Sequence, residues 1–461
     1  MSTRYATYSY WLETCGDDLT PRPALDGTVD VDVAILGAGF TGLWTAYYLL
    51  EREPSLRIAI LEREIAGFGA SGRNGGGLGN RFPVGLRRFA ELFGRPATVD
   101  LQRALNGVVD EVAGVAEREG IAMDYVRGGY LRLARSPYQL DILASEQRTL
   151  EEYGFGDDAV LLDARQVAER VSVVGALGGL YSHSSAKIQP ATLVRGLARA
   201  VERRGATLYE QSPVTAYTTG AYPVLHTARG HARARTIVLA GESYLSRFPR
   251  LRRKVLPVYS LITLTEPLSS AEWQEIGWEA REGLSSATHM VKYLTRTADG
   301  RVLFGGRGAP YHVGSTIKDD YDRHEPTHRM LQDDVRAWFP GLRNVRFTHT
   351  WGGPLGWPRD YVPTVSYDPA EGLAAAYGYT GTGVGPSNLF GRMLADLITR
   401  SDSEISRLPF VNRRGRNWEP EPFRFLGVRY VQHGFEQLDR RAEATGIAPG
   451  GRSLAERLTR H

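Results

Sequence analysis

Three glycines near the N-terminus have the spacing of a dinucleotide-binding turn. Gly37, Gly39 and Gly42 form the pattern G-x-G-x-x-G. The first glycine allows a tight turn, the second lets the backbone approach a pyrophosphate, and the third lets the next helix pack against the preceding strand. Glu62 follows twenty residues after Gly42, where a carboxylate can accept hydrogen bonds from ribose hydroxyls. The residues therefore predict binding of a dinucleotide without a 2′-phosphate, because Glu62 would repel that group.

A strand, a helix and a second strand must position these residues. Residues 31–36 form a short apolar run rich in branched side chains, typical of a strand buried on both faces of a parallel sheet. We expect a helix over residues 41–52, with its N-terminal amides directed at the phosphates, and a strand over residues 57–61 that ends beside Glu62. A glycine-rich turn can arise by chance, but this order of elements favours the dinucleotide site.

A second glycine-rich loop narrows the choice of cofactor. Residues 67–77 read GFGASGRNGGG, with glycine at six of eleven positions. Ordering so flexible a segment requires a compensating contact, which a large flat ligand supplies. Together, ILGAGFTGLWTAYYL, LERE and GFGASGRNGG resemble the FAD-dependent D-amino-acid oxidase and sarcosine oxidase superfamily. Within it, the chain is most similar to the gamma-glutamylputrescine oxidoreductase-like branch.

The resemblance implies a set of FAD contacts. In the family the second glycine loop lies along the isoalloxazine ring, and a later glycine turn begins a helix directed at the pyrimidine end of the flavin. A plain glycine-rich connection is the competing interpretation of that later turn. Gly77 departs from the bulky aromatic that many relatives carry. The implied FAD-binding residues are Gly37, Gly39, Phe40, Thr41, Gly42, Glu62, Arg63, Gly69, Ala70, Ser71, Arg73, Asn74, Gly75, Gly76, Val214, Gly241, Gly353, Gly381, Thr382, Gly383 and Val384.

The resemblance also implies that FAD is bound non-covalently. The sarcosine oxidase branch tethers its flavin through a cysteine far downstream, and no cysteine follows Cys15 in this chain. A related dehydrogenase branch uses a histidine in the second glycine loop, where this chain has Arg73. Neither covalent attachment is therefore expected.

The expected fold is α/β, with a Rossmann-type FAD-binding domain and a substrate domain built on a mostly antiparallel β-sheet. The two domains are discontinuous and interleaved, because segments that resemble FAD contacts recur along the chain. We assign residues 31–85, 186–250 and 350–400 to the FAD-binding domain, residues 86–185 and 251–349 to the substrate domain, residues 1–30 to an N-terminal arm and residues 401–461 to a C-terminal helical cap.

Arginine and aromatic side chains are the candidates for substrate binding. Arg296 lies in a predicted hairpin over residues 293–306, near where relatives that oxidise amino acids place a carboxylate-binding arginine, and its planar fork suits that role. Arg307 is a competing candidate, and an exposed salt bridge explains either arginine equally well. Aromatic side chains on neighbouring segments can form a cage for an amine cation, although core packing explains them more often. These aromatic residues are Tyr259, Tyr293, Trp351 and Tyr379.

Composition excludes several classes of function. The 461 residues are 42% hydrophobic and 23% charged, with a net charge of +4 from scattered basic residues, so no nucleic-acid surface is indicated. No apolar run approaches the length of a membrane span and no signal peptide is recognised, which favours a cytoplasmic location, as does the single cysteine. No metal site is predicted, because His183, His289 and His349 lack the spacing of metal ligands.

The predicted function is FAD-dependent oxidation of a C–N bond in a small amine or amino acid. Hydride transfer to flavin N5 would give an imine that water hydrolyses to an aldehyde or keto product, with O₂ as the expected acceptor and H₂O₂ as its product. Such chemistry needs orientation more than acid–base groups. Two alternatives stay open: an FAD-dependent dehydrogenase of a hydroxy acid, and a flavin-binding protein without turnover.

Overall fold

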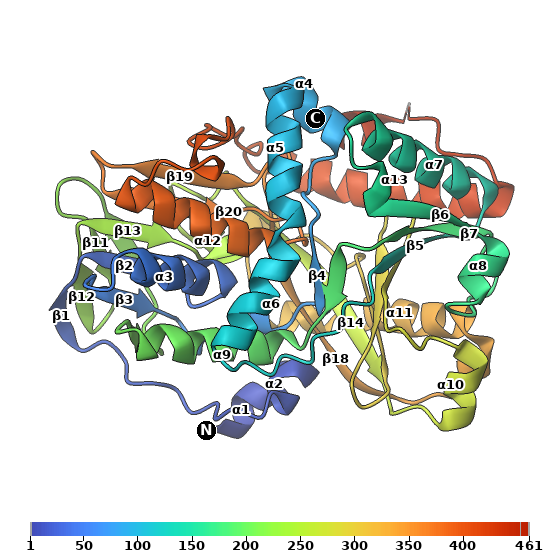
Figure 1. Ribbon diagram of the computed structural model, residues 1–461, viewed down its shortest axis with the longest axis horizontal. Helices are drawn as coiled ribbons and strands as arrows, with labels where there is room; N and C mark the ends of the chain where they lie inside the picture. The colour runs from blue at the N-terminus through green and yellow to red at the C-terminus, as the bar shows by residue number, and fades with distance from the viewer. Residues whose placement is uncertain (1, 452, 460–461) are drawn as a thin grey trace.

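Two large β-sheets lie side by side in the computed structural model, with a column of helices between them (Figure 1). The structure describes residues 2–451 and 453–459. Residue 1 of the expected N-terminal arm, and residues 452 and 460–461 of the expected C-terminal cap, lie outside this part of the chain.

The first sheet has six strands in the order β19-β20-β13-β2-β3-β9, all parallel except β19 at the edge. This is the nucleotide-binding sheet that the glycine pattern predicts, and β2 and β3 match two of the predicted strands. The six strands are β2 (Val33–Leu36), β3 (Ile58–Leu61), β9 (Thr207–Tyr209), β13 (Thr236–Leu239), β19 (Thr364–Asp368) and β20 (Leu373–Tyr377).

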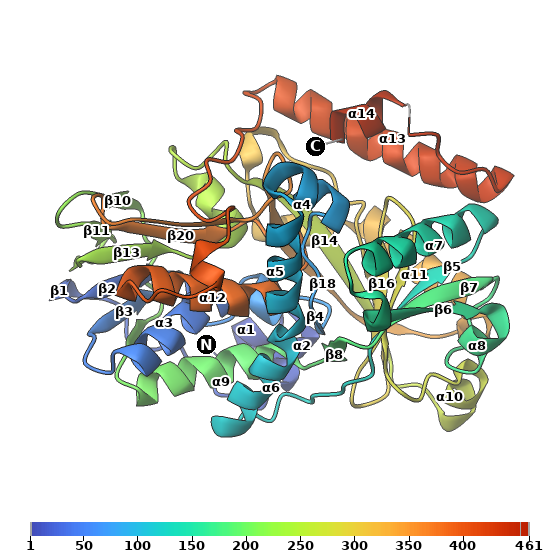
Figure 2. The ribbon, with the colours of Figure 1, turned by 45° about the horizontal axis from the view of Figure 1, so that its top comes forward.

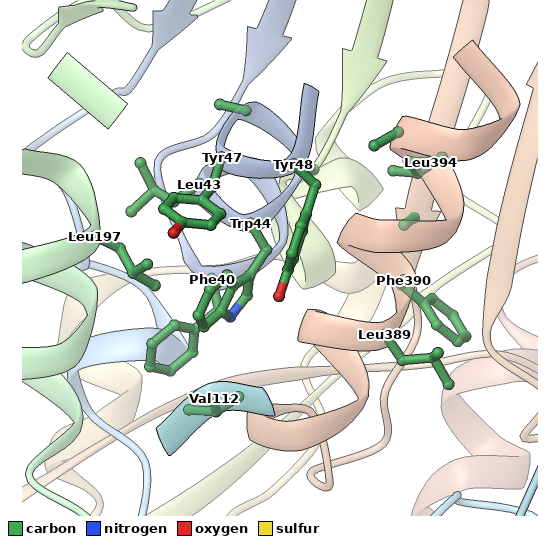
Figure 3. Packing of buried hydrophobic residues seen from close by; sticks show 14 of the residues in the cluster. Phe40, Leu43, Trp44, Tyr47, Tyr48, Val112, Leu197, Leu389, Phe390 and Leu394 are labelled. Atoms are coloured by element: carbon green, nitrogen blue, oxygen red, sulfur yellow. The ribbon is translucent and has the colours of Figure 1, made fainter. Parts of the chain in front are cut away.

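The apolar strands of this sheet are buried on both faces. Val33 and Ile35 of β2 pack into one core cluster, whereas Ala34 between them packs into another, as the two-residue period of a strand requires. One face is covered by α3 (Phe40–Arg52), α9 (Pro190–Arg203) and α12 (Val384–Thr399). Figure 3 shows aromatic residues of α3, including Trp44 and Tyr48, between α9 and α12.

A four-stranded sheet covers the other face and was not predicted from the sequence. Its order is β1-β12-β11-β10, and its buried Leu225 and Ala232 pack against Ala34, Ala59 and neighbouring residues of the parallel sheet. Its strands are only three or four residues long, too short to give a clear periodic pattern. They are β1 (Gly27–Asp30), β10 (Ala216–Thr218), β11 (Val224–His226) and β12 (Gly230–Arg233).

The second large sheet has eight strands in the order β18-β14-β17-β16-β15-β5-β7-β6. Every pair is antiparallel except β15 with β5, so the predicted mostly antiparallel sheet is confirmed. The strands are β5 (Tyr130–Ala134), β6 (Ala159–Asp163), β7 (Gly178–Ser182), β14 (Leu256–Thr265), β15 (Gly283–Ser286), β16 (Lys292–Arg296), β17 (Val302–Gly306) and β18 (Phe347–Trp357). Around it lie α7 (Pro137–Glu152), α8 (Ala164–Ala168), α10 (Ser270–Ile276) and α11 (Glu325–Trp338).

Two segments lie with a different sheet from the one expected. Strand β18 crosses the boundary expected at residue 350 and pairs with β14 along its length, so residues 350–357 belong to the eight-stranded sheet. The helices α4 (Leu86–Phe93), α5 (Arg95–Asn106) and α6 (Val108–Arg118) bury residues such as Val112 in the same core as α3 and α12. These helices therefore complete the core beside the parallel sheet, because their apolar faces pack there.

The chain ends are helical. The N-terminal arm contains α1 (Ser2–Ala6) and α2 (Tyr10–Thr14). Its Trp11 and Leu12 are buried in a cluster with residues of both halves, including Ala191 and Ile262. The long helix α13 (Phe423–Thr445) and the short α14 (Leu454–Thr459) lie across the outside of the eight-stranded half (Figure 2). No helix within residues 2–451 and 453–459 combines the length and apolar character needed to traverse a bilayer. A two-stranded sheet of β4 (Gly77–Gly79) and β8 (Ser185–Lys187) joins the two halves.

Candidate functional site

The first glycine turn joins β2 to α3 in the geometry that its sequence predicts. Gly37 has φ of +101°, which favours glycine. A Cβ on Gly42 would lie 2.0 Å from the Gly37 carbonyl oxygen, so only glycine fits there. Gly39 caps α3 without a side-chain hydrogen bond. The start of α3 thus presents backbone N–H groups and a positive dipole end to the cavity beside it.

A cavity of about 650 Å³ lies at the carboxyl ends of the parallel strands. This is the place where open α/β sheets bind their ligands. Fifteen of the predicted FAD-binding residues line it, although their contact with FAD stays a prediction. They are Gly37, Gly39, Phe40, Thr41, Glu62, Arg63, Gly69, Ala70, Ser71, Asn74, Val214, Gly241, Gly381, Gly383 and Val384.

Glu62 stands at the end of β3 on the wall of this cavity. Its carboxylate accepts hydrogen bonds from the backbone N–H of Ala38 at 2.9 Å and of Glu64 at 3.0 Å. Burial raises the pKa of the Glu62 carboxyl to about 7, although these two hydrogen bonds oppose the shift. The carboxylate is therefore fixed in position to accept hydrogen bonds from a ribose.

The second glycine loop is held between the first glycine turn and the N-terminal arm. Ser71 Oγ accepts a hydrogen bond from the Phe40 N–H at 2.8 Å. Asn74 Oδ1 accepts one from the Gly76 N–H at 2.9 Å, and the Trp11 indole donates to the Asn74 carbonyl at 2.7 Å. These contacts order a segment whose glycines would otherwise make it flexible.

A second cavity, of about 380 Å³, adjoins the first. The two cavities share Ala70, Asn74, Leu355, Gly381 and Val384 on their walls. Arg73, Gly75, Gly353 and Thr382, which were predicted to contact FAD, line only the second cavity. Gly42 and Gly76 line neither cavity; each allows a close backbone approach instead.

Four arginines line the second cavity: Arg73, Arg81, Arg132 and Arg307. Among the described residues, no aspartate or glutamate lines it. Arg73 is buried and pairs with Asp322 at 3.4 Å, so its charge is compensated. The second cavity is therefore electropositive, which favours an anionic ligand.

Within the described residues, no carboxylate pairs with Arg307, and its guanidinium carbon lies 4.6 Å from the centre of the Trp357 ring. Burial lowers the pKa of Arg307, but an arginine of such high intrinsic pKa stays charged at neutral pH. A partly buried guanidinium without a counter-charge is a binding group for a carboxylate.

Tyr293 forms a wall of the second cavity between two glycines. A Cβ on Gly75 would lie 2.5 Å from the Tyr293 ring, and one on Gly305 would lie 2.2 Å from it. Both glycines are thus needed to make room for the ring. The Tyr293 hydroxyl is 3.2 Å from Ser260 Oγ, and burial raises its pKa to about 12, which keeps the phenol protonated at neutral pH.

Three of the other candidates for substrate contact, Arg296, Tyr259 and Trp351, line neither cavity. Arg296 lies on the opposite face of β16 from Tyr293, because their separation of three residues reverses the side chain in a strand. Its guanidinium donates to the Trp278 carbonyl at 2.7 Å and lies over the Trp273 ring. The expectation that Arg296 meets a substrate at the flavin is therefore corrected.

Tyr259 and Trp351 are also placed away from the cavities, although Tyr379 is not. The Tyr259 hydroxyl donates to the Lys318 carbonyl at 3.1 Å, on the core side of β14. Trp351 is fully buried, and its indole N–H donates a hydrogen bond to the Arg73 carbonyl at 2.9 Å. It therefore stabilises the backbone of the second glycine loop. Tyr379 lines the first cavity, and its hydroxyl lies 2.8 Å from Thr41 Oγ1.

The start of α12 forms one end of both cavities. Gly383 caps this 16-residue helix without a side-chain hydrogen bond, and Gly381 and Val384 line both cavities. The positive dipole end of α12 is thus available to stabilise negative charge on a bound group.

Sequence reasoning missed several residues of the first cavity. Glu242 is the most constrained of them: φ is +47°, and its carboxylate accepts hydrogen bonds from three backbone N–H groups, at Gly356, Gly378 and Tyr379. Burial raises the pKa of Glu242 to about 7. The neighbouring Gly241 was predicted, but only the structure brings Glu242 to these backbone N–H groups of distant chain segments. The others are Leu36, Leu61, Phe68, Pro213, Thr215, Ala240, Ser243, Tyr244, Arg247, Phe248, Leu355 and Ser387.

Comparisons with known proteins agree with this geometry. The family described as FAD dependent oxidoreductase (DAO) matches residues 32–397. Gamma-glutamylputrescine oxidoreductase of Escherichia coli is 29% identical over 92% of this chain and 97% of its own length. Glycine oxidase of Geobacillus kaustophilus is 24% identical over 82% of this chain and 96% of its own length.

The solved structure of glycine oxidase from Geobacillus kaustophilus is similar in fold. It has a TM-score of 0.71 at 22% identity, covering 84% of this chain and 99% of the other. The predicted fold class, a parallel FAD-binding sheet with a mostly antiparallel second sheet, is confirmed by this similarity and by the strand order.

Proposed function

Since the chain belongs to the family of FAD-dependent oxidoreductases, we propose that it oxidises the C–N bond of an amino acid whose carboxylate is bound by Arg307. The observation that carries this proposal is the second cavity, which adjoins the first and is lined by arginines and by no described acidic residue. An amine without a carboxylate would meet uncompensated positive charge there. The name of the relative glycine oxidase also refers to an amino acid.

The residues of the first cavity fit FAD bound non-covalently. The uncapped starts of α3 and α12 offer N–H donors to anionic groups, and Glu62 offers acceptors to a ribose. FAD bound there supplies the oxidant, because its flavin accepts a hydride from the carbon beside the nitrogen. The two cavities share five lining residues, so a ligand in the second would lie beside a group bound in the first.

In this proposal the chain contributes orientation rather than proton transfer. Arg307 fixes the carboxylate by charge-assisted hydrogen bonds, and the rigid Tyr293 ring limits where the reacting carbon can lie. No histidine, aspartate or glutamate among the described residues lines the second cavity. The substrate ammonium must therefore lose its proton to solvent, and the rate of flavin reduction should rise with pH until the substrate amine is neutral.

The test is the visible spectrum of the purified holoprotein, taken without oxygen before and after adding separate pools of amino acids, simple amines and hydroxy acids. We expect the amino-acid pool to bleach the flavin absorbance and the other two pools to leave it unchanged. Bleaching by the hydroxy-acid pool alone would replace the proposal with the dehydrogenase alternative. No bleaching by any pool would overturn the proposed reaction. Admitting air to the reduced protein and assaying H₂O₂ then identifies the acceptor.

A further inference from the structure

The end of the second cavity away from Arg307 carries two more arginines. Arg132 lies on β5, where Leu131 and Leu133 are fully buried in the core of the eight-stranded half. The alternation of a strand therefore places Arg132 on the face that lines the cavity. Arg81 approaches from the loop before α4, and its guanidinium lies 5.1 Å from the centre of the Tyr130 ring. Both guanidinium groups thus belong to one wall.

These two arginines share a single carboxylate. Arg81 Nη2 lies 3.6 Å from Glu146 Oε1, and Arg132 Nη1 contacts Glu146 Oε2. Glu146 comes from α7 and does not line the cavity, whereas both arginines do. The wall therefore keeps one uncompensated positive charge. Burial lowers the pKa of Arg132, and the nearby charge of Arg81 adds to that shift, so the pair would be stabilised by another anion.

The register of the sheet separates this pair from Arg307. Arg132 pairs with Ser285, Ser285 with Tyr293, and Tyr293 with Gly305. These three steps between neighbouring strands span roughly 14 Å at about 4.8 Å each. Arg307 follows Gly305 by two residues and so stands on the same face. The guanidinium groups are also held by different neighbours, Arg132 by Glu146 and Arg307 by Trp357, so we treat them as two separate cationic ends.

We propose that Arg81 and Arg132 form a second anion subsite, and that the substrate is an amino acid with a second carboxylate at the far end of its side chain or N-substituent. One carboxylate then binds Arg307 and the other binds the Arg81–Arg132 pair, with the reacting C–N bond between them, near Tyr293 and the first cavity. The two uncompensated charges of the cavity are matched by the two carboxylates. This inference rests on the proposed function, because it names the class of amino acid.

The first test compares acidic amino acids with their neutral amides in the holoenzyme. The pairs are aspartate with asparagine and glutamate with glutamine, each as both enantiomers, with flavin reduction followed in the absence of oxygen. We expect kcat/KM to favour the acidic member of at least one pair by tenfold or more, because a charge-assisted contact is lost in the amide. Equal kcat/KM in every pair would overturn the second subsite and leave the proposed function standing.

The second test measures binding without turnover. Isothermal titration of the oxidised holoenzyme with glutarate and with its monoamide, glutaramate, should show a Kd at least tenfold lower for glutarate. Arg81→Gln should reduce that ratio to below threefold, whereas Arg87→Gln, whose partner Glu152 lies outside the cavity, should keep it. An unchanged ratio in Arg81→Gln would refute the assignment.

A second variant is needed because Arg132 alone can bind the carboxylate once Arg81 is replaced. The triple replacement of Arg81→Gln, Arg132→Met and Glu146→Leu removes both arginines together with the carboxylate that they share, so no charge of the cluster is left without a partner. We expect it to lose the preference for glutarate as well. If glutarate binds selectively but no amino acid reduces the flavin, the subsite stands as an anion site and the proposed function fails. The two failures are therefore distinguishable.

Discussion

Replacing Arg307 by glutamine should separate amino-acid oxidation from every other property of the site. Arg307 lines the second cavity and does not line the first. No carboxylate among the described residues pairs with Arg307, so its removal leaves no acidic side chain without its counter-charge. We expect the variant to fold, to bind FAD as tightly as wild type, and to lose transition-state stabilisation for substrates that carry a carboxylate.

The size of the loss follows from the bonds removed. Hydrogen bonds between charged partners contribute about 1.5–3 kcal/mol, which corresponds to a fall in kcat/KM of about 10- to 150-fold. Glutamine retains much of the volume that packs beside Trp357, so lost packing adds little. The kcat/KM of Arg307→Lys should lie between those of the wild type and Arg307→Gln, because lysine keeps the charge but loses the planar fork.

Stopped-flow flavin reduction without oxygen is the assay, with an amino acid and its decarboxylated amine as substrates. The amino acid should lose its advantage over the amine in Arg307→Gln. Arg296→Gln, on the other face of the same hairpin and stacked on Trp273, is the matched control and should leave kcat/KM within about twofold. An equal fall for amino acid and amine, or no fall at all, would show that Arg307 does not bind the carboxylate.

Three further predictions concern the first cavity. Glu62→Ala should weaken FAD binding by tenfold or more in a fluorescence titration, because charged hydrogen bonds of about 1.5–3 kcal/mol are lost; an unchanged Kd would exclude the ribose contact. Gly42→Ala should lower the free energy of unfolding by about 3 kcal/mol or more in urea, since its Cβ would lie 2.0 Å from the Gly37 carbonyl oxygen; a wild-type midpoint would contradict that clash. Burial raises the pKa of Glu242 from 4.5 to about 7 on folding, so the apoprotein should lose up to about 3 kcal/mol of stability as pH rises from below 4.5 through 7. Glu242→Gln should remove the share of Glu242 in this loss and leave the share of Glu62, whose pKa burial also raises to about 7; an equally steep loss would assign the dependence to other groups.

Much of the nucleotide-binding half could be predicted because its signals are local. The spacing of Gly37, Gly39 and Gly42, the apolar run before them and Glu62 after them all depend on residues close together in the chain. Steric limits on a tight turn and the period of buried strands translate directly into such patterns. The structure has this turn and this strand order, and Glu62 lines the expected cavity.

The short strands of the four-stranded sheet and the position of β18 were not predicted. Three- and four-residue strands carry too little periodicity to be recognised. Strand β18 joins the eight-stranded sheet by pairing with β14, some ninety residues earlier in the chain, and a pairing over that separation leaves no local pattern. The segment of helices α4–α6 was assigned to the substrate domain, whereas these helices join the core beside the parallel sheet, because the core that a helix joins depends on which apolar faces meet.

By itself, the sequence determined the dinucleotide turn, the family and the antiparallel hairpin that carries both Arg296 and Arg307. Only the tertiary structure decided which arginine lines the cavity, because a strand places alternate side chains on opposite faces and packing selects the face that meets the cofactor cavity. Arg81, Arg132 and Arg307 lie far apart in the chain and share one cavity through the order of strands in the sheet. The charge of the second cavity, and with it the class of substrate, is therefore a property of the folded chain.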